Sequence, residues 1–581
     1  MKPWSDDQLL RQGVSGTRRG MLELGARSGL LALLGAASPV VVSTTMPGRY
    51  DDALGLLDQY AELYRRDLLA PGLVMVLTDA TGVQRLRAYG FDDPAAQTPL
   101  NADRLIHIGS ISKSFVAICL LQLREEGRLD LRRPITDYLP WLRYDGATRL
   151  IGAHDLLTHS AALPDGPLFP ADPTLRYLGT AAPGSIFHYC NMGYVALGHL
   201  VAKLDARPLS ASLRARILEP LGMTQTDPAI TLDTFEKVAG SFQPAYSDRP
   251  FPRDGRLVCS PPIVMTDGSG CIASTARDMG QYLMMLVNRG AYAGGRLLSE
   301  EGFTLLTHPH VAAREFGPDA FYGYGVVVDQ IEGHTRIRHT GGMVSFASSL
   351  EVDLEAGVGA FASINAMQTF RPRPITTYAL RLMRVAKEGA QLPALPPANL
   401  SWRVEAATDY VGPFMSTDGK AIELVAEGER LFLIRDGHRA VLEPMFEVED
   451  AFVVADPLYE QSPLAFTRAG PDGKGPVVEA GWGEEWYFNQ RYQGPRSFDV
   501  PAAWRLYRGH YRSEDPWIGS VRIVLRRGKL WVNGAVPLED GGNGRFYFRD
   551  EPQSPEWIAF SDFVYGVPMT LSQSGWVLHR V

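Results

Sequence analysis

The sequence predicts an α+β fold, in which a domain with an antiparallel sheet and helices is followed by two small all-β, barrel-like domains. Three observations support this prediction. Strand-like segments stand at both ends of a largely helical region, a proline- and alanine-rich stretch follows it, and short alternating strands with glycine turns fill the remainder. A chain of 581 residues is also too long for one hydrophobic core, so about three domains are expected.

The first domain is predicted to span residues 50–388. Apolar side chains recur at helical spacing in residues 52–67, and residues 72–77 form an apolar run typical of a strand. Strand-like segments return at residues 322–330 and 350–364, with helical stretches in between. Strands at both ends of a helical middle region indicate that the two ends of this domain share one antiparallel sheet.

Residues 389–402 are predicted to form a linker, because residues 391–399 are rich in proline and alanine. Two barrel-like domains are expected after it, at residues 403–500 and 501–581. They carry many aromatic side chains, among them Trp482, Trp486 and Trp517. These side chains fit a barrel core better than a glycan-binding or partner-binding surface, which is the alternative.

The C-terminal part of the chain is internally repeated. Residues 410–414, Tyr-Val-Gly-Pro-Phe, match residues 507–511, Tyr-Arg-Gly-His-Tyr. Each segment is followed by an alternating strand, a glycine turn (Gly428 or Gly528) and an apolar strand. A tandem pair of similar β units is therefore expected.

Residues 1–45 are predicted to be an export signal. Arg18 and Arg19 precede an apolar run at residues 28–42, an order that resembles a twin-arginine signal. The run is shorter than the roughly 20 residues of a membrane-spanning helix, so no stable membrane span is expected in the mature chain. We expect a periplasmic or secreted bacterial protein. An amphipathic N-terminal helix is the alternative.

Composition narrows the class of protein. Hydrophobic residues make up 45% and charged residues 21% of the chain, which fits a globular protein rather than a disordered or membrane one. The formal net charge is -8 and no basic stripe is present, so nucleic acid is not an expected partner. The expected partner is a small-molecule or peptide substrate, and the oligomeric state is left open.

No cofactor or metal is expected. The sequence has no His-Glu-x-x-His or Cys-x-x-Cys pattern and no glycine loop of the phosphate-binding kind. Its cysteines are sparse for an exported chain and are expected to be buried free thiols: Cys119, Cys190, Cys259 and Cys271.

The strongest candidate for a catalytic pair is Ser110 with Lys113. They are three residues apart at the start of an apolar helix, a spacing that places both side chains on one helix face. A serine hydroxyl is a weak nucleophile and needs a neighbouring base. A lysine whose pKa is lowered by burial can be that base, and the apolar helix gives Lys113 a buried setting.

Tyr189 and Asn191 form a second candidate element. A phenol can shuttle a proton when a cation stabilises its phenolate, which is the role considered for Tyr189. The amide of Asn191 can bind both a lysine and a substrate carbonyl. Tyr-x-Asn on its own is common by chance.

His339, Gly341 and Gly342 form the third element, in a His-Thr-Gly-Gly segment between two strands. Glycines at a strand edge allow a substrate backbone to lie alongside. The backbone N–H of Gly342 is expected to join that of Ser110 in an oxyanion hole, while His339 and Gly341 are expected to contact the substrate.

The order Ser-x-x-Lys, Tyr-x-Asn and then His-Thr-Gly resembles the serine β-lactamase and penicillin-binding protein superfamily, in particular its class C β-lactamase-like branch. Further stretches resemble the same family, at residues 154–164, 268–279 and 322–325. The resemblance covers about residues 50–385 in the expected order. It implies a β-lactamase/transpeptidase-like catalytic domain.

The resemblance implies an acyl-enzyme mechanism. Ser110 would attack a carbonyl, Lys113 and Tyr189 would share the general-base work, and Tyr189 would pass a proton to the leaving group. Asn191 would bind the substrate amide. Which of Lys113 and Tyr189 is the base stays open.

His339 departs from the family pattern, because β-lactamases carry lysine there. A histidine is a weaker anchor for a substrate carboxylate than a fixed ammonium. This favours a D-aminopeptidase, amidase or esterase, and D-aminopeptidases of the family also carry two β-barrel domains. A penicillin-binding protein or β-lactamase is the alternative, and a non-catalytic binding or regulatory protein on this scaffold is a second.

Overall fold

The computed structural model describes residues 50–581 except for a few short segments: 143, 146–149, 168–176, 179–181, 368–369, 398–401, 446–447, 471–472, 516, 543 and 549–553. The predicted export signal at residues 1–45 lies outside the described residues, as does part of the predicted linker. Within that linker, residues 390–397 have no regular secondary structure. The domain boundaries predicted from sequence stay a prediction.

An antiparallel sheet built from nine strands of the described chain forms the centre of the N-terminal part, in the order β12-β13-β14-β15-β16-β17-β1-β2-β3. Strands from the two ends of this part meet where β1 pairs with β17, for example Met75 opposite Ala362. This confirms the prediction of one α+β domain with an antiparallel sheet. The strands are β1 (Gly72–Asp79), β2 (Gly82–Asp93), β3 (Thr98–Pro99), β12 (Val311–Ala312), β13 (Phe321–Tyr322), β14 (Val327–Ile331), β15 (His334–Gly342), β16 (Ala347–Asp353) and β17 (Val358–Ile364).

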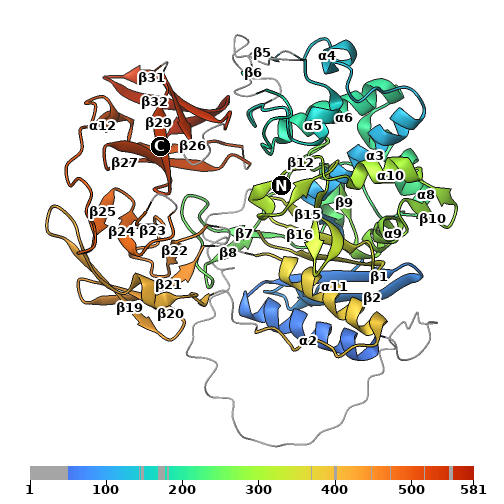
Figure 1. The fold of residues 1–581 in the computed structure, drawn as a ribbon, viewed down its shortest axis with the longest axis horizontal. Coiled ribbons are helices and arrows are strands. Elements are labelled where there is room, and N and C mark those ends of the chain that lie inside the picture. Colours follow the sequence, from blue (N-terminus) through green and yellow to red (C-terminus); the bar gives the residue numbers. More distant parts are fainter. Residues whose placement is uncertain are drawn as a thin grey trace, which may run out of the picture.

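Helices cover both faces of this sheet (Figure 1). Alternate residues of β1 point to opposite sides, so that Leu73 and Met75 pack with α2 (Asp51–Asp67) and α11 (Arg373–Glu388). Val74 and Val76 face the other side and pack in the core that includes α3 (Ser112–Glu125) and α9 (Ala276–Val287). A strand buried on both faces explains why residues 72–77 are uniformly apolar.

Shorter elements complete the helical region on the α3 side. The helices are α4 (Ile135–Tyr138), α5 (Ala153–Leu157), α6 (Asn191–Asp205), α7 (Leu209–Leu213), α8 (Glu219–Leu221) and α10 (Glu300–Thr307). Two-stranded pairings join β4 (Ile106–His107) to β9 (Ala273–Ser274), β5 (Tyr144–Asp145) to β6 (Tyr177–Leu178), β7 (Phe242–Pro244) to β8 (Leu257–Cys259) and β10 (Ala291–Tyr292) to β11 (Gly295–Arg296).

Two closed barrels follow, each with eight strands in the described part of the chain. The repeated segments occupy equivalent places, because Tyr410 and Tyr507 each end a helical turn before the first strand of a barrel. Gly428 and Gly528 turn the chain between the second and third strands. The predicted tandem β units are confirmed. The helix before the second barrel is α12 (Trp504–Tyr507), and the strands are β18 (Gly412–Met415), β19 (Ala421–Glu427), β20 (Arg430–Arg435), β21 (His438–Pro444), β22 (Ala451–Val454), β23 (Leu464–Arg468), β24 (Val477–Trp482), β25 (Glu485–Phe488), β26 (Gly509–Arg512), β27 (Ser520–Arg526), β28 (Lys529–Val532), β29 (Val536–Asp540), β30 (Arg545–Phe548), β31 (Trp557–Val564), β32 (Val567–Gln573) and β33 (Trp576–Arg580).

The three tryptophans singled out in the tail differ in their surroundings. Trp482 lies in the core of the first barrel, as expected. Trp486 is half-buried and donates a hydrogen bond to Glu479 over 2.9 Å. Trp517 is exposed, so the expectation of a core position is wrong for this residue.

Both barrels contact the N-terminal part around the β7–β8 hairpin, which extends toward them in Figure 1. The backbone N–H of Arg253 donates to Glu443 of the first barrel over 2.6 Å. Arg522 of the second barrel donates to the backbone oxygen of Asp248 over 3.1 Å and pairs with its carboxylate over 2.5 Å. The barrels are therefore attached by polar contacts near the hairpin as well as by the chain.

The cysteines are free thiols in the structure. Cys119, Cys190 and Cys271 are buried as expected, whereas Cys259 is exposed at the end of β8, so the expectation of burial is wrong there. Among the described residues, no helix is long and apolar enough to cross a membrane.

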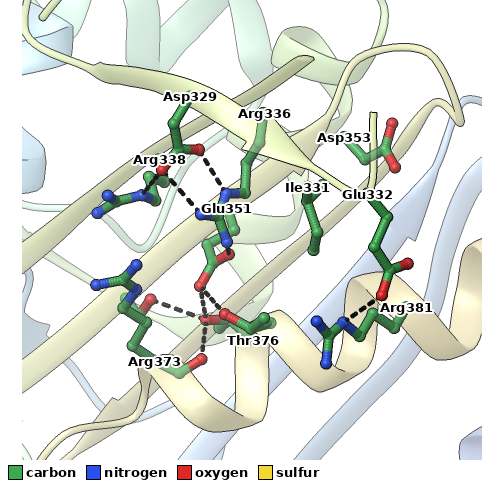
Figure 2. Close-up of polar contacts among 12 residues, drawn as sticks. Asp329, Ile331, Glu332, Arg336, Arg338, Glu351, Asp353, Arg373, Thr376 and Arg381 are labelled. Carbon is green, nitrogen blue, oxygen red and sulfur yellow. Dashed lines mark hydrogen bonds and ion pairs between the residues drawn. The ribbon is translucent and has the colours of Figure 1, made fainter. Parts of the chain in front are cut away.

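A buried network of charges fixes the strand β15. Figure 2 shows Arg336 between Asp329 of β14 and Glu351 of β16, with distances of 2.7 and 2.9 Å. Arg338 also pairs with Asp329, over 2.8 Å, and Thr376 of α11 donates to Glu351 over 2.7 Å. Each buried charge has a partner of opposite sign or a donor, which buried ions require. The network ties β15 to both neighbouring strands and to α11.

Replacing Glu351 by alanine is expected to destabilise the N-terminal part by about 3–5 kcal/mol, because Arg336 would lose a partner in a buried place. Glu301→Ala is the control. Its carboxylate is largely exposed and pairs with Arg124 over 2.6 Å, so a loss of about 0–1 kcal/mol is expected. Thermal unfolding followed by circular dichroism measures both. Equal losses in the two variants would contradict the importance of the buried network.

Candidate active site

The candidate nucleophile lies on a tight turn at the start of α3. Ser110 is in the middle of the 3₁₀ turn Gly109–Ile111, which continues into the helix at Ser112. Residues three apart lie on one face of a helix, so the turn and the start of α3 bring Ser110 and Lys113 together. A hydrogen bond from a distant segment fixes the residue before this turn: the N–H of Ile108 donates to the carbonyl of Ile272 over 3.1 Å. Ser110 itself is half-buried, so its hydroxyl remains reachable.

Lys113 is fully buried and its amine makes three hydrogen bonds. Nζ lies 3.0 Å from Oγ of Ser110, 2.8 Å from Oδ1 of Asn191 and 2.8 Å from the carbonyl oxygen of Ser269. Burial lowers the pKa of the Lys113 amine to about 7, although Asp165 and Asp267 act in the opposite direction. Near neutral pH a large share of Lys113 is therefore an uncharged amine beside a serine hydroxyl.

Tyr189 lies against the same amine. The centre of its ring is 4.9 Å from Nζ of Lys113. Burial raises the pKa of the Tyr189 phenol well above its ordinary value, while a hydrogen bond with Ser110 opposes that shift. The phenol is thus protonated at neutral pH and suited to donate a proton. Forming its phenolate costs more than deprotonating Lys113.

His159 holds the segment that carries Tyr189. The rings of His159 and Tyr189 are 4.3 Å apart between centres. The N–H of Cys190 donates to Nδ1 of His159 over 3.0 Å, and the N–H of His188 donates to its carbonyl over 2.8 Å. The family-like stretch at residues 154–164 therefore has a structural role that its sequence pattern did not reveal: it anchors the residues on both sides of Tyr189.

Asn191 is the first residue of α6 and connects Lys113 to a carboxylate that sequence reasoning missed. Its Nδ2 donates to Asp165 over 2.8 Å, while its Oδ1 accepts from Lys113. The N–H of Met192 also donates to Asp165, over 3.0 Å. Burial raises the pKa of the Asp165 carboxyl, with these two donors opposing the shift. Asp165 thus fixes which end of the Asn191 amide faces Lys113.

The end of β15 lies against the nucleophile turn. A side chain at Gly341 would place its Cβ 1.9 Å from the carbonyl oxygen of Ile108. Gly109 has a φ of +54°, and a Cβ there would lie 2.9 Å from the backbone nitrogen of Gly342. Only glycine permits this approach. It brings the backbone of Gly342 beside that of Ser110, as an oxyanion hole built from these two N–H groups requires.

His339 is buried on β15 and is neutral. Its Nε2 is 2.8 Å from the hydroxyl of Tyr322, and its Nδ1 is 2.6 Å from the carbonyl oxygen of Thr340. The carbonyl can only accept, so Nδ1 carries the proton and Nε2 accepts from Tyr322. Burial and the nearby Lys113 lower the pKa of the His339 imidazole to about 3. His339 therefore offers no positive charge to a substrate carboxylate.

The structure brings together the residues that the sequence singled out, namely Ser110, Lys113, Tyr189, Asn191 and the end of β15. Their catalytic roles and the substrate contacts of Asn191, His339 and Gly341 stay predictions. Asp165, His159 and the carbonyl of Ser269 complete the site. The carbonyl of Ser269 has no sequence signal of its own, although it falls within the family-like stretch at residues 268–279.

This fold and this serine–lysine site define a serine hydrolase. The Beta-lactamase family model matches residues 57–383, more than half of the 581-residue chain. The chain belongs to that family, which confirms the resemblance seen in its motifs.

Two of the relatives are named as enzymes. Esterase EstB from Burkholderia gladioli is 30% identical over 194 residues, which are 29% of this chain and about half (49%) of the esterase. The D-alanyl-D-alanine-carboxypeptidase/endopeptidase AmpH of Escherichia coli K12 is 27% identical over 282 residues, 45% of this chain and 69% of AmpH. The octameric penicillin-binding protein homologue from Pyrococcus abyssi shares the fold, with a TM-score of 0.53 and 22% identity, over 75% of this chain and 98% of that one.

The rate at which Ser110 is acylated is expected to rise with pH and to be half-maximal near pH 7. This expectation takes the neutral Lys113 amine, whose pKa is lowered to about 7, as the proton acceptor, so the base would be lost as the pH falls through this value. The burst of p-nitrophenol from p-nitrophenyl acetate measures this rate. Lys113→Arg keeps its charge and should stay slow at every pH. A wild-type rate that is unchanged across neutral pH would contradict the role of Lys113.

Gly109→Ala is expected to slow acylation of Ser110 by about tenfold or more, because the alanine Cβ would displace the backbone of Gly342 from the predicted oxyanion hole. Gly127→Ala is the matched control, since Gly127 also has a positive φ, +72°, but nothing lies within 4 Å of a Cβ there. Both variants should lose about 1–2 kcal/mol of stability from the left-handed backbone. The same burst measurement compares them, and equal rates would contradict the close approach of β15.

Proposed function

We propose that this chain forms an acyl-enzyme at Ser110 and cleaves small amides or esters, with amides and peptides of D-amino acids as the preferred amide class. The observation that carries the proposal is the buried Lys113 amine 3.0 Å from the Ser110 hydroxyl, with a pKa lowered to about 7. A neutral amine at this distance can take the hydroxyl proton at physiological pH.

In the proposed reaction, Oγ of Ser110 bonds to the substrate carbonyl carbon while its proton moves to Nζ of Lys113. The oxyanion of the tetrahedral intermediate accepts hydrogen bonds from the N–H groups of Ser110 and Gly342. The bond to the leaving group then breaks as Tyr189 gives its proton to the departing nitrogen or oxygen, and Lys113 restores the proton on Tyr189. Water attacks the acyl-enzyme by the reverse proton path and releases the acid.

This scheme assigns the general base to Lys113 and the proton donor to Tyr189. The assignment rests on their environments, because burial favours the neutral form of both groups. A neutral lysine is a base and a neutral phenol is an acid. Asn191, held by Asp165 on one side and Lys113 on the other, is proposed to bind the substrate amide.

The preference for neutral substrates rests on His339. Its ring is buried, its pKa is lowered to about 3, and both nitrogens are engaged within the protein. A substrate carboxylate would find no fixed ammonium at this place, in contrast to the β-lactamase pattern. We therefore propose that His339 positions β15 through Tyr322 and that β-lactams are poorer substrates than esters and amides. The names of the relatives EstB and AmpH include an esterase and a D-alanyl-D-alanine peptidase, which supports both halves of the proposed range.

Export remains part of the proposal. It rests on the twin arginine, Arg18-Arg19, and the apolar run at residues 28–42. A periplasmic or secreted location would give the enzyme access to peptides that contain D-amino acids.

Labelling with a fluorophosphonate tests the nucleophile, and a substrate panel tests the class. Wild-type protein should be labelled and Ser110→Ala should not. Hydrolysis of p-nitrophenyl acetate and D-alanine p-nitroanilide should exceed that of nitrocefin and of L-alanine p-nitroanilide. No labelling of either protein would overturn the enzyme proposal in favour of a non-catalytic binding protein. Faster turnover of nitrocefin than of esters or amides would favour the β-lactamase alternative.

A further inference from the structure

The second barrel reaches the active-site region through one carboxylate, Glu556, which stands directly before β31. Its Oε1 accepts a hydrogen bond from the backbone N–H of Asp165 over 2.6 Å and lies 2.8 Å from Nε2 of His188. Its other oxygen accepts from the hydroxyl of Ser574, between β32 and β33. Glu556 is thus tied to its own barrel on one side and to the N-terminal part on the other.

A tryptophan of the same barrel adds a second contact at the same place. Nε1 of Trp576, the first residue of β33, donates to the carbonyl oxygen of Asp165 over 3.0 Å. Both backbone groups of Asp165 are therefore bonded to the second barrel, while both of its carboxylate oxygens accept hydrogen bonds from Asn191 and Met192. A residue held by four directed contacts has little freedom to move.

The contacts continue without interruption to the catalytic amine. From Glu556 and Trp576 the chain of hydrogen bonds passes through Asp165 and the side chain of Asn191 to Nζ of Lys113. A second branch passes through His188, which is the neighbour of Tyr189 in sequence. The two site elements that come from loops, the Asp165 segment and the Tyr189 segment, meet at the same carboxylate.

Neither loop has secondary structure to hold it. Residues 164–167 and residues 182–190 are outside helices and strands, so their positions depend on tertiary hydrogen bonds. Within the N-terminal part, His159, Ser160 and the start of α6 supply some of these bonds. The second barrel supplies further ones.

We infer that Glu556 is a positioning residue of the active site, and that the second barrel is a structural part of the catalytic centre rather than only a cover over it or an independent binding module. This inference rests on the proposed function of Ser110. Glu556 acts through Asp165 and His188, which set the places of Asn191 and Tyr189. A small misplacement of such groups slows the chemical step by a large factor, whereas a barrel that only covers the site would tolerate the loss of one carboxylate.

The test compares Glu556 variants with a matched variant of the same interface. Arg522→Ala also removes a contact between the second barrel and the N-terminal part, the pair with Asp248, but Arg522 contacts none of the site residues named above. The measurements are the rate constant for fluorophosphonate labelling of Ser110, kcat and KM for p-nitrophenyl acetate, and the melting temperature.

Glu556→Ala is expected to lower the labelling rate and kcat by about tenfold or more, with a smaller change in KM. Glu556→Gln retains the shape and a carbonyl that accepts from the Asp165 N–H, so it should recover part of the rate. If the alanine variant does not fold, the rate of Glu556→Gln alone tests the positioning role of Glu556. Arg522→Ala should stay within about twofold of wild type in rate even where it melts at a lower temperature.

Two results would overturn the inference. The first is that Glu556→Gln and Glu556→Ala both react at the wild-type rate. The second is that the rate falls with the melting temperature to the same extent in the Glu556 and Arg522 variants. A wild-type protein that is not labelled at Ser110 would be a different failure. It would overturn the proposed function, and the inference with it.

Discussion

The chemistry of the site depends on the burial of one amine, that of Lys113. A lysine on a surface helix is a cation at neutral pH and cannot accept a proton. Here α3 is packed between the sheet and the surrounding helices, and the amine has no contact with solvent. Desolvation penalises the charged form and lowers the pKa of the amine to about 7, so that a largely uncharged amine stands beside Ser110 near neutral pH.

The surrounding groups set how far that shift goes. Asp165 and Asp267 raise the pKa of Lys113, which counteracts part of the effect of burial. Oδ1 of Asn191 and the carbonyl of Ser269 can accept the two protons of the neutral amine, which leaves its lone pair for the hydroxyl proton of Ser110. The same buried setting keeps the phenol of Tyr189 protonated and the imidazole of His339 neutral. One physical cause, burial without full charge compensation, therefore accounts for the neutral amine of Lys113, the protonated phenol of Tyr189 and the uncharged ring of His339.

Much of the architecture could be predicted because its signals are local. The apolar run at residues 72–77, the Ser110–Lys113 spacing and the glycine turns at Gly428 and Gly528 each indicate a feature that the structure contains. Asp165 could not be assigned a role, because its partners Asn191, Glu556 and Trp576 are distant in sequence and no spacing rule connects them. The charge of His339 could not be predicted from sequence either. A histidine can be neutral or protonated, and here the burial of the ring makes it neutral.

An NMR titration of the Lys113 side chain in lysine-labelled protein decides whether its amine is uncharged near pH 7. Lys113→Met identifies the signal by its loss. We expect this signal to titrate near pH 7, far from the exposed lysines. A Lys113 signal that keeps the shift of a protonated amine until the exposed lysines titrate would show that the amine is a cation at neutral pH, and Lys113 would not be the base.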